Sequence, residues 1–373
     1  MNPSKVNFVN FKTQCMSHGG AHTSKISNKK PIFIFGAGEF GKSVAKALKV
    51  NNFSVVGFIE TNPRQEIVDG LPVFSWGDLT AQNCLGQLLI GIYNRDAPFD
   101  ELMNLAKTSG FEDVLMPWDV YAALSNELGW RYWLSRKEVI LNAIDQIQNS
   151  FDLLSDEESK NTLLSICAFR LGLNDSYASF RHEDEQYFNS LTLNKFQNSN
   201  SCSYVDCGAY NGDTFIEAND KLPLSSAYLF EPDPTNFKQL VEAVKNSSLT
   251  PICFPIAVAD HYQILSFSGT GEGGAISLNG SVHIAAASLD ELLPNSTVDF
   301  IKFDVEGAEA PAVLGARQLI QRSRPVLVLS LYHRPADLWE IPALIAGLCP
   351  HYNFYIRQHF NNSFDSVLYA IPQ

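Results

Sequence analysis

A glycine turn and an acid on the following strand have the spacing of a nucleotide site. A strand-like run at 204–207 leads into a turn with Gly208 and Gly212, and a helical pattern follows. Glycine lets the backbone approach a ligand closely, and a helix N-terminus offers free N–H groups to a carboxylate or phosphate. Glu231 ends the next predicted strand, where a carboxylate can accept hydrogen bonds from both hydroxyls of a ribose. An ordinary strand–helix turn with a solvated acid would show the same glycines, so this spacing alone leaves both alternatives open.

Three further acids follow the apolar strand predicted at 300–303, namely Asp304, Glu306 and Glu309. Ligands of doubly wound sheets bind at the edge where the carboxyl ends of the parallel strands meet. We therefore expect these acids to lie beside the glycine turn. Lys302 lies inside the strand, where an unpaired charge would be costly, so we expect it to have a carboxylate partner.

Four motifs in this order resemble those of the FkbM family of methyltransferases. They are Val-Asp-Cys-Gly-Ala-Tyr-Asn-Gly-Asp-Thr at 205–214, Phe-Glu-Pro-Asp at 230–233, Ser-Leu-Asp-Glu-Leu at 288–292 and Ile-Lys-Phe-Asp-Val-Glu-Gly-Ala-Glu at 301–309. The resemblance covers roughly residues 200–373. It implies a class I methyltransferase fold that uses S-adenosyl-L-methionine as its cofactor.

The resemblance also implies which residues hold the cofactor. The first motif would hold its methionine part, Glu231 its ribose, and the end of the predicted strand 252–258 its adenine. Where the family often has Asn before the small pair at 257–258, this chain has Pro-Ile. The cofactor residues implied in this way are Asp206, Gly208, Ala209, Gly212, Thr214, Glu231, Ala257, Val258 and Asp304.

Asp304 and His333 are the predicted catalytic residues. His333 follows the predicted strand 326–331, and a neutral imidazole can take a proton from an attacking hydroxyl. Its alternative role is to cap the loop before Pro335. Asp304 and His333 could together hold a hard metal ion, but no ligand spacing demands one, and we predict no metal.

The same spacing of glycines and an acid occurs again near the N-terminus. Gly36, Gly38 and Gly41 stand between a predicted strand and a predicted helix, and Glu60 ends the next strand. With further motifs in 57–73, this half resembles the small nucleotide-binding domains found before sugar-modifying transferases. We expect either a second site, for NAD or a nucleotide sugar, or a docking domain without a nucleotide.

Alternating strand and helix patterns predict an α/β protein with two doubly wound, Rossmann-like domains joined by a helical connector. The last two strands, 353–358 and 366–370, have no helix between them and predict an antiparallel pair. The polar segment 262–287 predicts a hairpin or a mobile loop. The predicted domains are a flexible arm (1–30), a Rossmann-like nucleotide-binding-type domain (31–120), the helical connector (121–200) and a methyltransferase domain (201–373).

Composition narrows the possible partners. The 373 residues carry a formal net charge of −13, which disfavours a nucleic-acid partner. No apolar stretch approaches the ~20 residues that span a bilayer, and the cysteines, without a CxxC pair, are typical of a cytoplasmic protein with reduced thiols. We therefore expect a methyltransferase that transfers its methyl group to an oxygen of a small-molecule or carbohydrate acceptor. The alternative is an NAD-dependent oxidoreductase or a nucleotide-sugar-binding protein that uses the N-terminal domain. The sequence leaves open whether the protein forms a homo-oligomer.

Overall fold

The computed structural model describes residues 8–18, 26–174, 176, 180–268, 275–276 and 282–373. The chain forms two compact units, and each is discontinuous in sequence. Unit 1 comprises Met1–Asp145, Asn161–Arg181 and Phe360–Phe364, and unit 2 comprises Gln146–Lys160, His182–His359 and Asp365–Gln373. The linear domain boundaries at residues 30, 120 and 200 remain predictions.

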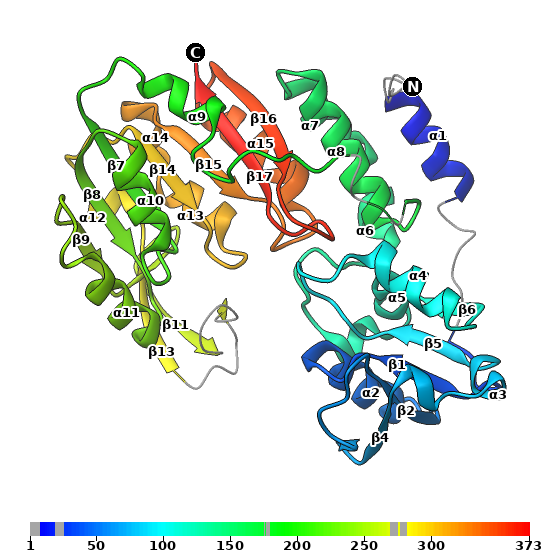
Figure 1. The fold of residues 1–373 in the computed structure, drawn as a ribbon. Coiled ribbons are helices and arrows are strands. Elements are labelled where there is room, and N and C mark those ends of the chain that lie inside the picture. The colour runs from blue at the N-terminus through cyan, green and yellow to red at the C-terminus, as the bar shows by residue number, and fades with distance from the viewer. Residues whose placement is uncertain (1–7, 19–25, 175, 177–179, 269–274, 277–281) are drawn as a thin grey trace. The chain divides into compact units, whose positions relative to one another are not determined.

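A doubly wound sheet forms the centre of unit 1 (blue to cyan in Figure 1). Its strand order is β3-β4-β2-β1-β5-β6, and neighbouring strands are parallel except for the β3–β4 pair. Strands β1 and β5 are buried along their whole length, as expected when helices cover both faces of a parallel sheet. The strands are β1 (Ile32–Phe35), β2 (Val55–Ile59), β3 (Ile67–Val68), β4 (Leu71–Phe74), β5 (Gln87–Ile90) and β6 (Asp113–Leu115).

The helices of unit 1 include one that the sequence did not indicate. Residues 1–30 were expected to be a flexible arm, but helix α1 spans Phe8–His18, and its Phe8, Phe11 and Cys15 are buried. The expectation is therefore wrong for residues 8–18, while 1–7 and 19–25 lie outside the described residues. The other helices that lie within unit 1 are α2 (Glu39–Val50), η1 (Trp76–Asp78), α3 (Ala81–Cys84), α4 (Phe99–Thr108), α5 (Pro117–Leu128) and α6 (Lys137–Asn142).

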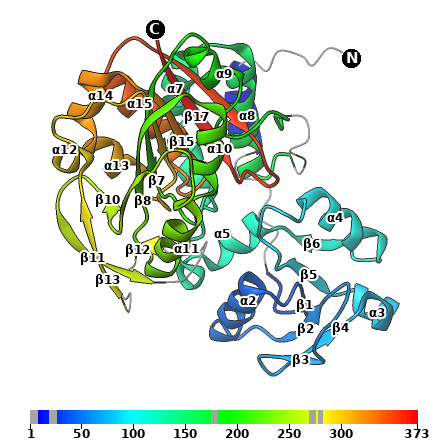
Figure 2. The same cartoon turned by 60° about the vertical axis from the view of Figure 1, so that its left-hand side comes forward.

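Unit 2 contains a larger sheet with the order β16-β17-β15-β14-β7-β8-β9 (Figures 1 and 2). Neighbouring strands are parallel except that β17 runs antiparallel to both β15 and β16. This confirms the predicted second doubly wound sheet and its terminal antiparallel pair. The strands are β7 (Cys202–Cys207), β8 (Leu224–Phe230), β9 (Ile252–Phe254), β14 (Phe300–Phe303), β15 (Val326–Ser330), β16 (Tyr352–Gln358) and β17 (Ser366–Pro372).

A small sheet beside the larger one corrects the predicted strand 252–258. That segment divides into β9 and β10 (Ala257–Val258), and β10 pairs with β13 (Val282–Ala287) in a sheet of order β10-β13-β11-β12. Pro255 explains the break, because it has no N–H to continue the β9 ladder. Strand β11 (Gln263–Ser268) is antiparallel to β13 and to β12 (Ala275–Ile276), which confirms pairing in the 262–287 segment. The glycine-rich part at 269–274 lies outside the described residues.

The predicted helical connector is shared between the two units. Helices α7 (Ile144–Leu153) and α8 (Glu157–Arg170) each have residues in both units. Among the described residues, no helix is both long and apolar enough to cross a membrane. The remaining helices, all in unit 2, are α9 (Ser190–Leu193), η2 (Asn194–Phe196), α10 (Asp213–Lys221), α11 (Pro234–Val244), α12 (Leu289–Leu292), α13 (Glu309–Gly315), α14 (Arg317–Ser323) and α15 (Asp337–Leu348).

The packing of α1 can be tested with a matched pair of substitutions. Phe11 is 2% exposed and Val9 is 65% exposed on the same helix. We expect Phe11→Ala to lower the free energy of unfolding by about 3 kcal/mol, because it leaves a cavity. Val9→Ala should change it by less than about 0.5 kcal/mol. Urea unfolding measures both, and equally small effects would show that α1 is not packed.

Candidate functional site

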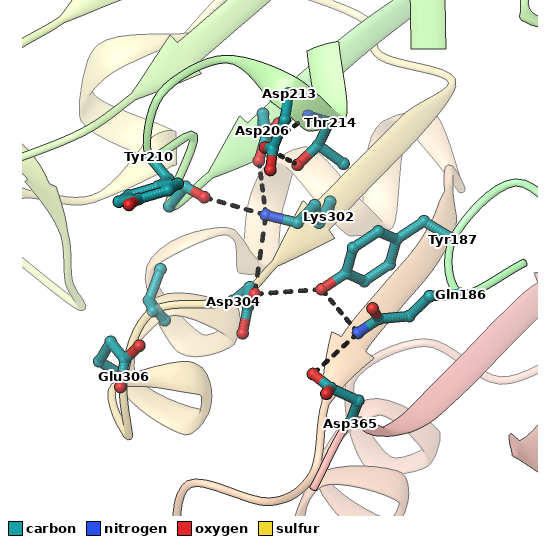
Figure 3. Close-up of polar contacts among 12 residues, drawn as sticks. Gln186, Tyr187, Asp206, Tyr210, Asp213, Thr214, Lys302, Asp304, Glu306 and Asp365 are labelled. Atoms are coloured by element: carbon teal, nitrogen blue, oxygen red, sulfur yellow. Dashed lines mark hydrogen bonds and ion pairs between the residues drawn. The ribbon is translucent and has the colours of Figure 1, made fainter. Parts of the chain in front are cut away.

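A buried lysine connects the ends of β7 and β14 (Figure 3). Lys302 Nζ lies 3.0 Å from Asp206 Oδ1 and 2.9 Å from the carbonyl oxygen of Gly208. The other oxygen of Asp206 accepts a hydrogen bond from the Tyr204 hydroxyl at 3.0 Å. Burial alone would lower the pKa of Lys302, but the charges of Asp206 and Asp304 outweigh it and raise the pKa. The predicted carboxylate partner of Lys302 is confirmed.

The turn after β7 requires glycine at its first position. Gly208 has φ +88°, and a Cβ at this position would collide with the carbonyl oxygen of Asp304. The turn therefore lies directly against the end of β14. Gly212 begins α10 in the left-handed region, and Ala209 and Thr214 are both buried around it. The backbone of the first motif thus reaches the carboxyl edge of the sheet, as predicted.

Glu231 closes the same turn from the end of β8. Its Oε2 accepts a hydrogen bond from Tyr210 N, and its Oε1 accepts one from Asp233 N, both at 2.9 Å. Burial raises the pKa of Glu231 to about 7, against the opposing effect of these backbone hydrogen bonds. The carboxyl group therefore changes its charge close to neutral pH.

Asp304 occupies the end of β14, next to the turn. Its Oδ2 accepts a hydrogen bond from the Tyr187 hydroxyl at 3.0 Å and lies 4.0 Å from Lys302 Nζ. Burial would raise the pKa of Asp304, but the positive charges of Lys302 and His333 outweigh it and lower the pKa. Asp304 is therefore a carboxylate at neutral pH.

His333 follows β15 and is completely buried. Its Nδ1 lies 2.7 Å from Glu309 Oε1, and its Nε2 lies 3.6 Å from Asp304 Oδ1 and 3.6 Å from Glu306 Oε2. Burial alone would lower the pKa of His333, but Glu309 and Glu306 raise it to about 10. An imidazole that is already protonated cannot accept a proton. In the chain without ligands the imidazole is therefore positively charged at neutral pH, and the role of His333 as a general base stays a prediction.

Two more acids near His333 have strongly raised pKa values. Burial raises the pKa of Glu306 to about 7, and the charges of Asp304 and Glu309 add to this effect. Burial also raises the pKa of Asp337 to about 8, again with a contribution from Glu309. Crowded carboxyl groups repel each other, so this edge of unit 2 favours a positive charge.

Arg357 and His359 belong to the packing of the C-terminal strands. Arg357 pairs with Asp156 at 2.7 Å, and His359 contacts the Tyr369 hydroxyl at 2.6 Å. Burial lowers the pKa of His359 to about 4, so it is neutral at neutral pH. Both side chains are buried and already engaged within the chain.

Three side chains that form a chain of hydrogen bonds with Asp304 were not predicted from the sequence, namely Tyr187, Gln186 and Asp365. Tyr187 donates to Asp304, and Gln186 Nε2 donates to Asp365 Oδ1 at 3.3 Å (Figure 3). Gln186 and Tyr187 precede α9 and belong to no helix or strand, although they fall within the predicted helical connector. The only available signal was a tyrosine in an otherwise polar stretch, which is too common to predict a site.

The structure brings most of the predicted cofactor residues to one edge of the larger sheet. Ala257 and Val258 instead form β10 of the small sheet, where both are buried, and their place in an adenine pocket stays a prediction. The residues that lie at the ends of β7, β8 and β14, in the turn between β7 and α10 or in the first turn of α10 are Asp206, Gly208, Ala209, Gly212, Thr214, Glu231 and Asp304.

The N-terminal glycine motif of unit 1 has a similar arrangement. Gly36 follows β1 with φ +103°, Gly38 caps α2, and Gly41 lies in the first turn of that helix. The Glu60 carboxyl group accepts a hydrogen bond from Ala37 N at 3.4 Å, as Glu231 does from Tyr210 N in unit 2. The predicted residues therefore come together, and a ligand for them stays a prediction.

Comparison with known proteins finds family models that match two segments of the chain. Residues 206–364 match the model of the methyltransferase FkbM domain, which is the segment that contains Glu231, Asp304 and His333. Over this segment the chain is similar to the methyltransferase FkbM domain. Residues 31–92 match the PglD N-terminal domain, which includes the glycine motif of unit 1. No curated protein matches the chain.

A solved structure of similar fold covers almost the whole chain. Methyltransferase FkbM from Methylobacillus flagellatus KT has a TM-score of 0.78 and 20% sequence identity, over 98% of this chain and 100% of that chain. At this identity the likeness shows the shared fold alone. The fold is the predicted one, with two Rossmann-like domains of which the C-terminal one has the class I methyltransferase fold. Precorrin-6y C5,15-methyltransferase from Geobacter metallireducens GS-15 has a TM-score of 0.32 and 13% identity, over 52% of this chain and 93% of that chain. Gln186 and Tyr187 precede the matched FkbM segment, so the candidate site extends beyond it.

The close approach of the turn to β14 can be tested at Gly208. We expect Gly208→Ala to destabilise the FkbM domain by at least about 2 kcal/mol, because it adds a left-handed strain and a clash with backbone. Gly347→Ala, in helix α15 with open space around it, should be neutral or stabilise by up to about 1 kcal/mol. Thermal unfolding compares the two, and a neutral Gly208→Ala would contradict the contact.

Proposed function

We propose that this protein transfers a methyl group from S-adenosylmethionine to an oxygen of a small hydroxyl compound such as a sugar. The observation that carries the proposal is the position of Glu231, which is hydrogen-bonded to the backbone of the glycine turn at 2.9 Å. One edge of the sheet therefore combines a carboxylate that can bind a ribose with a turn whose backbone can approach a ligand closely. The FkbM domain supplies the chemical class, and Asp304 lies at the neighbouring strand end.

In this proposal, the turn and Glu231 hold the cofactor. The turn 208–212 lies against the methionine part of the cofactor, and Glu231 accepts hydrogen bonds from the ribose hydroxyls. Both oxygens of Asp206 already accept hydrogen bonds within the chain. In this proposal Asp206 therefore supports the turn indirectly, by holding Lys302. The positive sulfonium supplies an activated methyl group, so the protein mainly aligns the acceptor oxygen with it.

Asp304 is the proposed catalytic carboxylate. Its Oδ2 is fixed by Tyr187, while its Oδ1 has no hydrogen-bond partner within the described chain. An ionised carboxylate in this position can orient the acceptor hydroxyl and share its proton as the new C–O bond forms. Tyr187 is a positioning residue, since it holds the carboxylate in place.

A small acceptor fits the charge of the chain better than a nucleic acid does. The formal net charge of −13 opposes binding to a phosphate backbone. A sugar or related hydroxyl compound carries no such charge and presents many oxygens. We therefore propose a small-molecule or carbohydrate acceptor.

Cofactor affinity should depend on pH through Glu231. Its pKa of about 7 without ligand lies above the ordinary value, and Asp233 is the neighbouring acid that adds to the effect of burial. Because ribose hydroxyls bind the ionised form, affinity rises with pH and should increase about tenfold from pH 6 to pH 8. Calorimetry with S-adenosylmethionine measures the change. Glu231→Gln should bind more weakly and lose this part of the pH dependence, and an unchanged affinity would count against the proposal.

The role of Asp304 can be tested by methyl transfer to a panel of sugars. Asp304→Asn removes the negative charge at nearly constant volume, and we expect the rate with bound cofactor to fall by at least about 100-fold. Asp220→Asn, at an exposed position of α10, is the matched control and should keep the wild-type rate. Full activity of Asp304→Asn would exclude Asp304 as the catalytic carboxylate.

Unit 1 supports a second candidate function, which is nucleotide binding. The observation in its favour is the contact of Glu60 with Ala37 N beside the glycine motif. Titration with NADH and with nucleotide sugars, followed by fluorescence or calorimetry, distinguishes a second nucleotide site from a docking domain. Binding that is weakened by Glu60→Ala would support the nucleotide site.

A further inference from the structure

The imidazole of His333 faces two carboxylate oxygens at distances that do not correspond to hydrogen bonds. His333 Nε2 lies 3.6 Å from Asp304 Oδ1 and 3.6 Å from Glu306 Oε2. Two ligand atoms that each lie about 2.1 Å from a shared metal ion are about 3.0 to 3.5 Å apart. Each carboxylate oxygen therefore lies at almost the distance from Nε2 that separates two ligands of one cation.

The carboxylate oxygens around this point lack hydrogen-bond partners. Asp304 Oδ1, Glu306 Oε2 and Glu309 Oε2 are buried, and none of them has a partner among the described residues. Glu309 is fully buried, so water does not solvate its second oxygen. Burying such oxygens without a partner is costly, and a bound cation removes much of that cost.

Glu309 fixes the imidazole in the orientation that a metal ligand requires. Its Oε1 accepts from His333 Nδ1 at 2.7 Å and also from Val305 N at 2.9 Å, so the carboxylate is held from two sides. Because Glu309 holds a proton on Nδ1, it is Nε2 that faces Asp304 and Glu306. Metal-binding histidines almost always donate their other ring N–H to a carboxylate or carbonyl in this way.

We propose that Asp304, Glu306 and His333 bind one divalent first-row metal ion, such as Mn²⁺ or Zn²⁺, and that Glu309 orients the imidazole. One nitrogen and two carboxylate ligands suit these ions, and the open positions would be filled by water or substrate. Ligand atoms of Asp304, Glu309 and His333 all lie within 4.8 Å of one another, so the orienting carboxylate Glu309 also lies close to the proposed ion. The proposal replaces the sequence-based prediction that no metal binds.

The role of this ion in the reaction rests on the proposed methyl transfer, whereas its binding does not. With such an ion bound, Asp304 would act as its ligand instead of sharing the proton itself, because the ion would bind the acceptor hydroxyl and lower its pKa, so that the proton leaves to solvent. The resulting oxygen forms the bond to the methyl carbon, and the carbon–sulfur bond breaks with its electrons going to sulfur. The products are a methyl ether, the neutral thioether form of the cofactor and one proton.

Metal binding can be measured directly on the full chain. The chain is treated with a chelator, dialysed and titrated with Mn²⁺, and free Mn²⁺ is followed by electron paramagnetic resonance and bound Mn²⁺ by calorimetry. We expect one ion per chain, which Zn²⁺ displaces. Glu306→Gln should weaken Mn²⁺ binding by at least about tenfold, and Glu309→Gln by about 10- to 100-fold. Glu340→Gln removes an exposed carboxylate of α15 and should bind as the wild type does.

Two results would overturn the proposal: the wild-type chain binds neither Mn²⁺ nor Zn²⁺, or Glu306→Gln binds Mn²⁺ as tightly as the wild type. The Glu306 side chain is 30% exposed, so this variant should fold, and its thermal unfolding checks that it does. If it does not fold, Asp304→Asn replaces it. S-adenosylmethionine binding is measured separately. Lost cofactor binding with retained Mn²⁺ binding would contradict the proposed function and leave the metal site standing.

Discussion

The site of unit 2 depends on one buried charge, the ammonium group of Lys302. Lys302 stands opposite Asp206 in the register of β14 and β7, and its Nζ also binds the carbonyl oxygen of Gly208. Removing one partner of a buried ion pair costs about 3 to 5 kcal/mol, because the remaining charge has no compensation. The lysine therefore fixes the start of the glycine turn to the strand that ends in Asp304. Glu231 completes this arrangement through its contact with Tyr210 N.

The two sides of the site differ in charge balance, and this difference separates their proposed tasks. On the turn side, Lys302 compensates Asp206, and backbone N–H groups surround Glu231. On the side of β14 and β15, carboxyl groups crowd around His333, and burial together with their repulsion raises the pKa of Glu306. The first environment suits a cofactor with a ribose, and the second suits a cation. An acceptor oxygen between them would meet both the methyl group and a group that favours its deprotonation.

Sequence patterns predicted the parts of this site that depend on strand ends. Asp304 and Glu231 directly follow apolar strands, so their position at one edge follows from the parallel sheet alone. The charge of His333 could not be predicted, because it depends on the approach of Glu309 from the following helix. Tyr187 comes from an irregular segment, and its contact with Asp304 exists only in the folded chain.

In the fold, too, features that follow from local sequence patterns were predicted, whereas features that depend on tertiary contacts were not. The alternation of strands and helices predicted both doubly wound sheets, since its period comes from local structure. Helix α1 has little amphipathic pattern of its own, and the burial of Phe11 shows that packing rather than local preference stabilises it. Pro255 could have indicated the break between β9 and β10, but the apolar run around it favoured one continuous strand. Tertiary contacts therefore account for most of the differences between the predicted fold and the structure.

The most direct test of the account is a crystal structure of the full chain grown with S-adenosylhomocysteine, the demethylated form of the cofactor. The account predicts that the ribose hydroxyls lie within hydrogen-bond distance of the Glu231 carboxyl group, with the sulfur facing Asp304. Binding beside Glu60 in unit 1, with the edge at Glu231 empty, would contradict it.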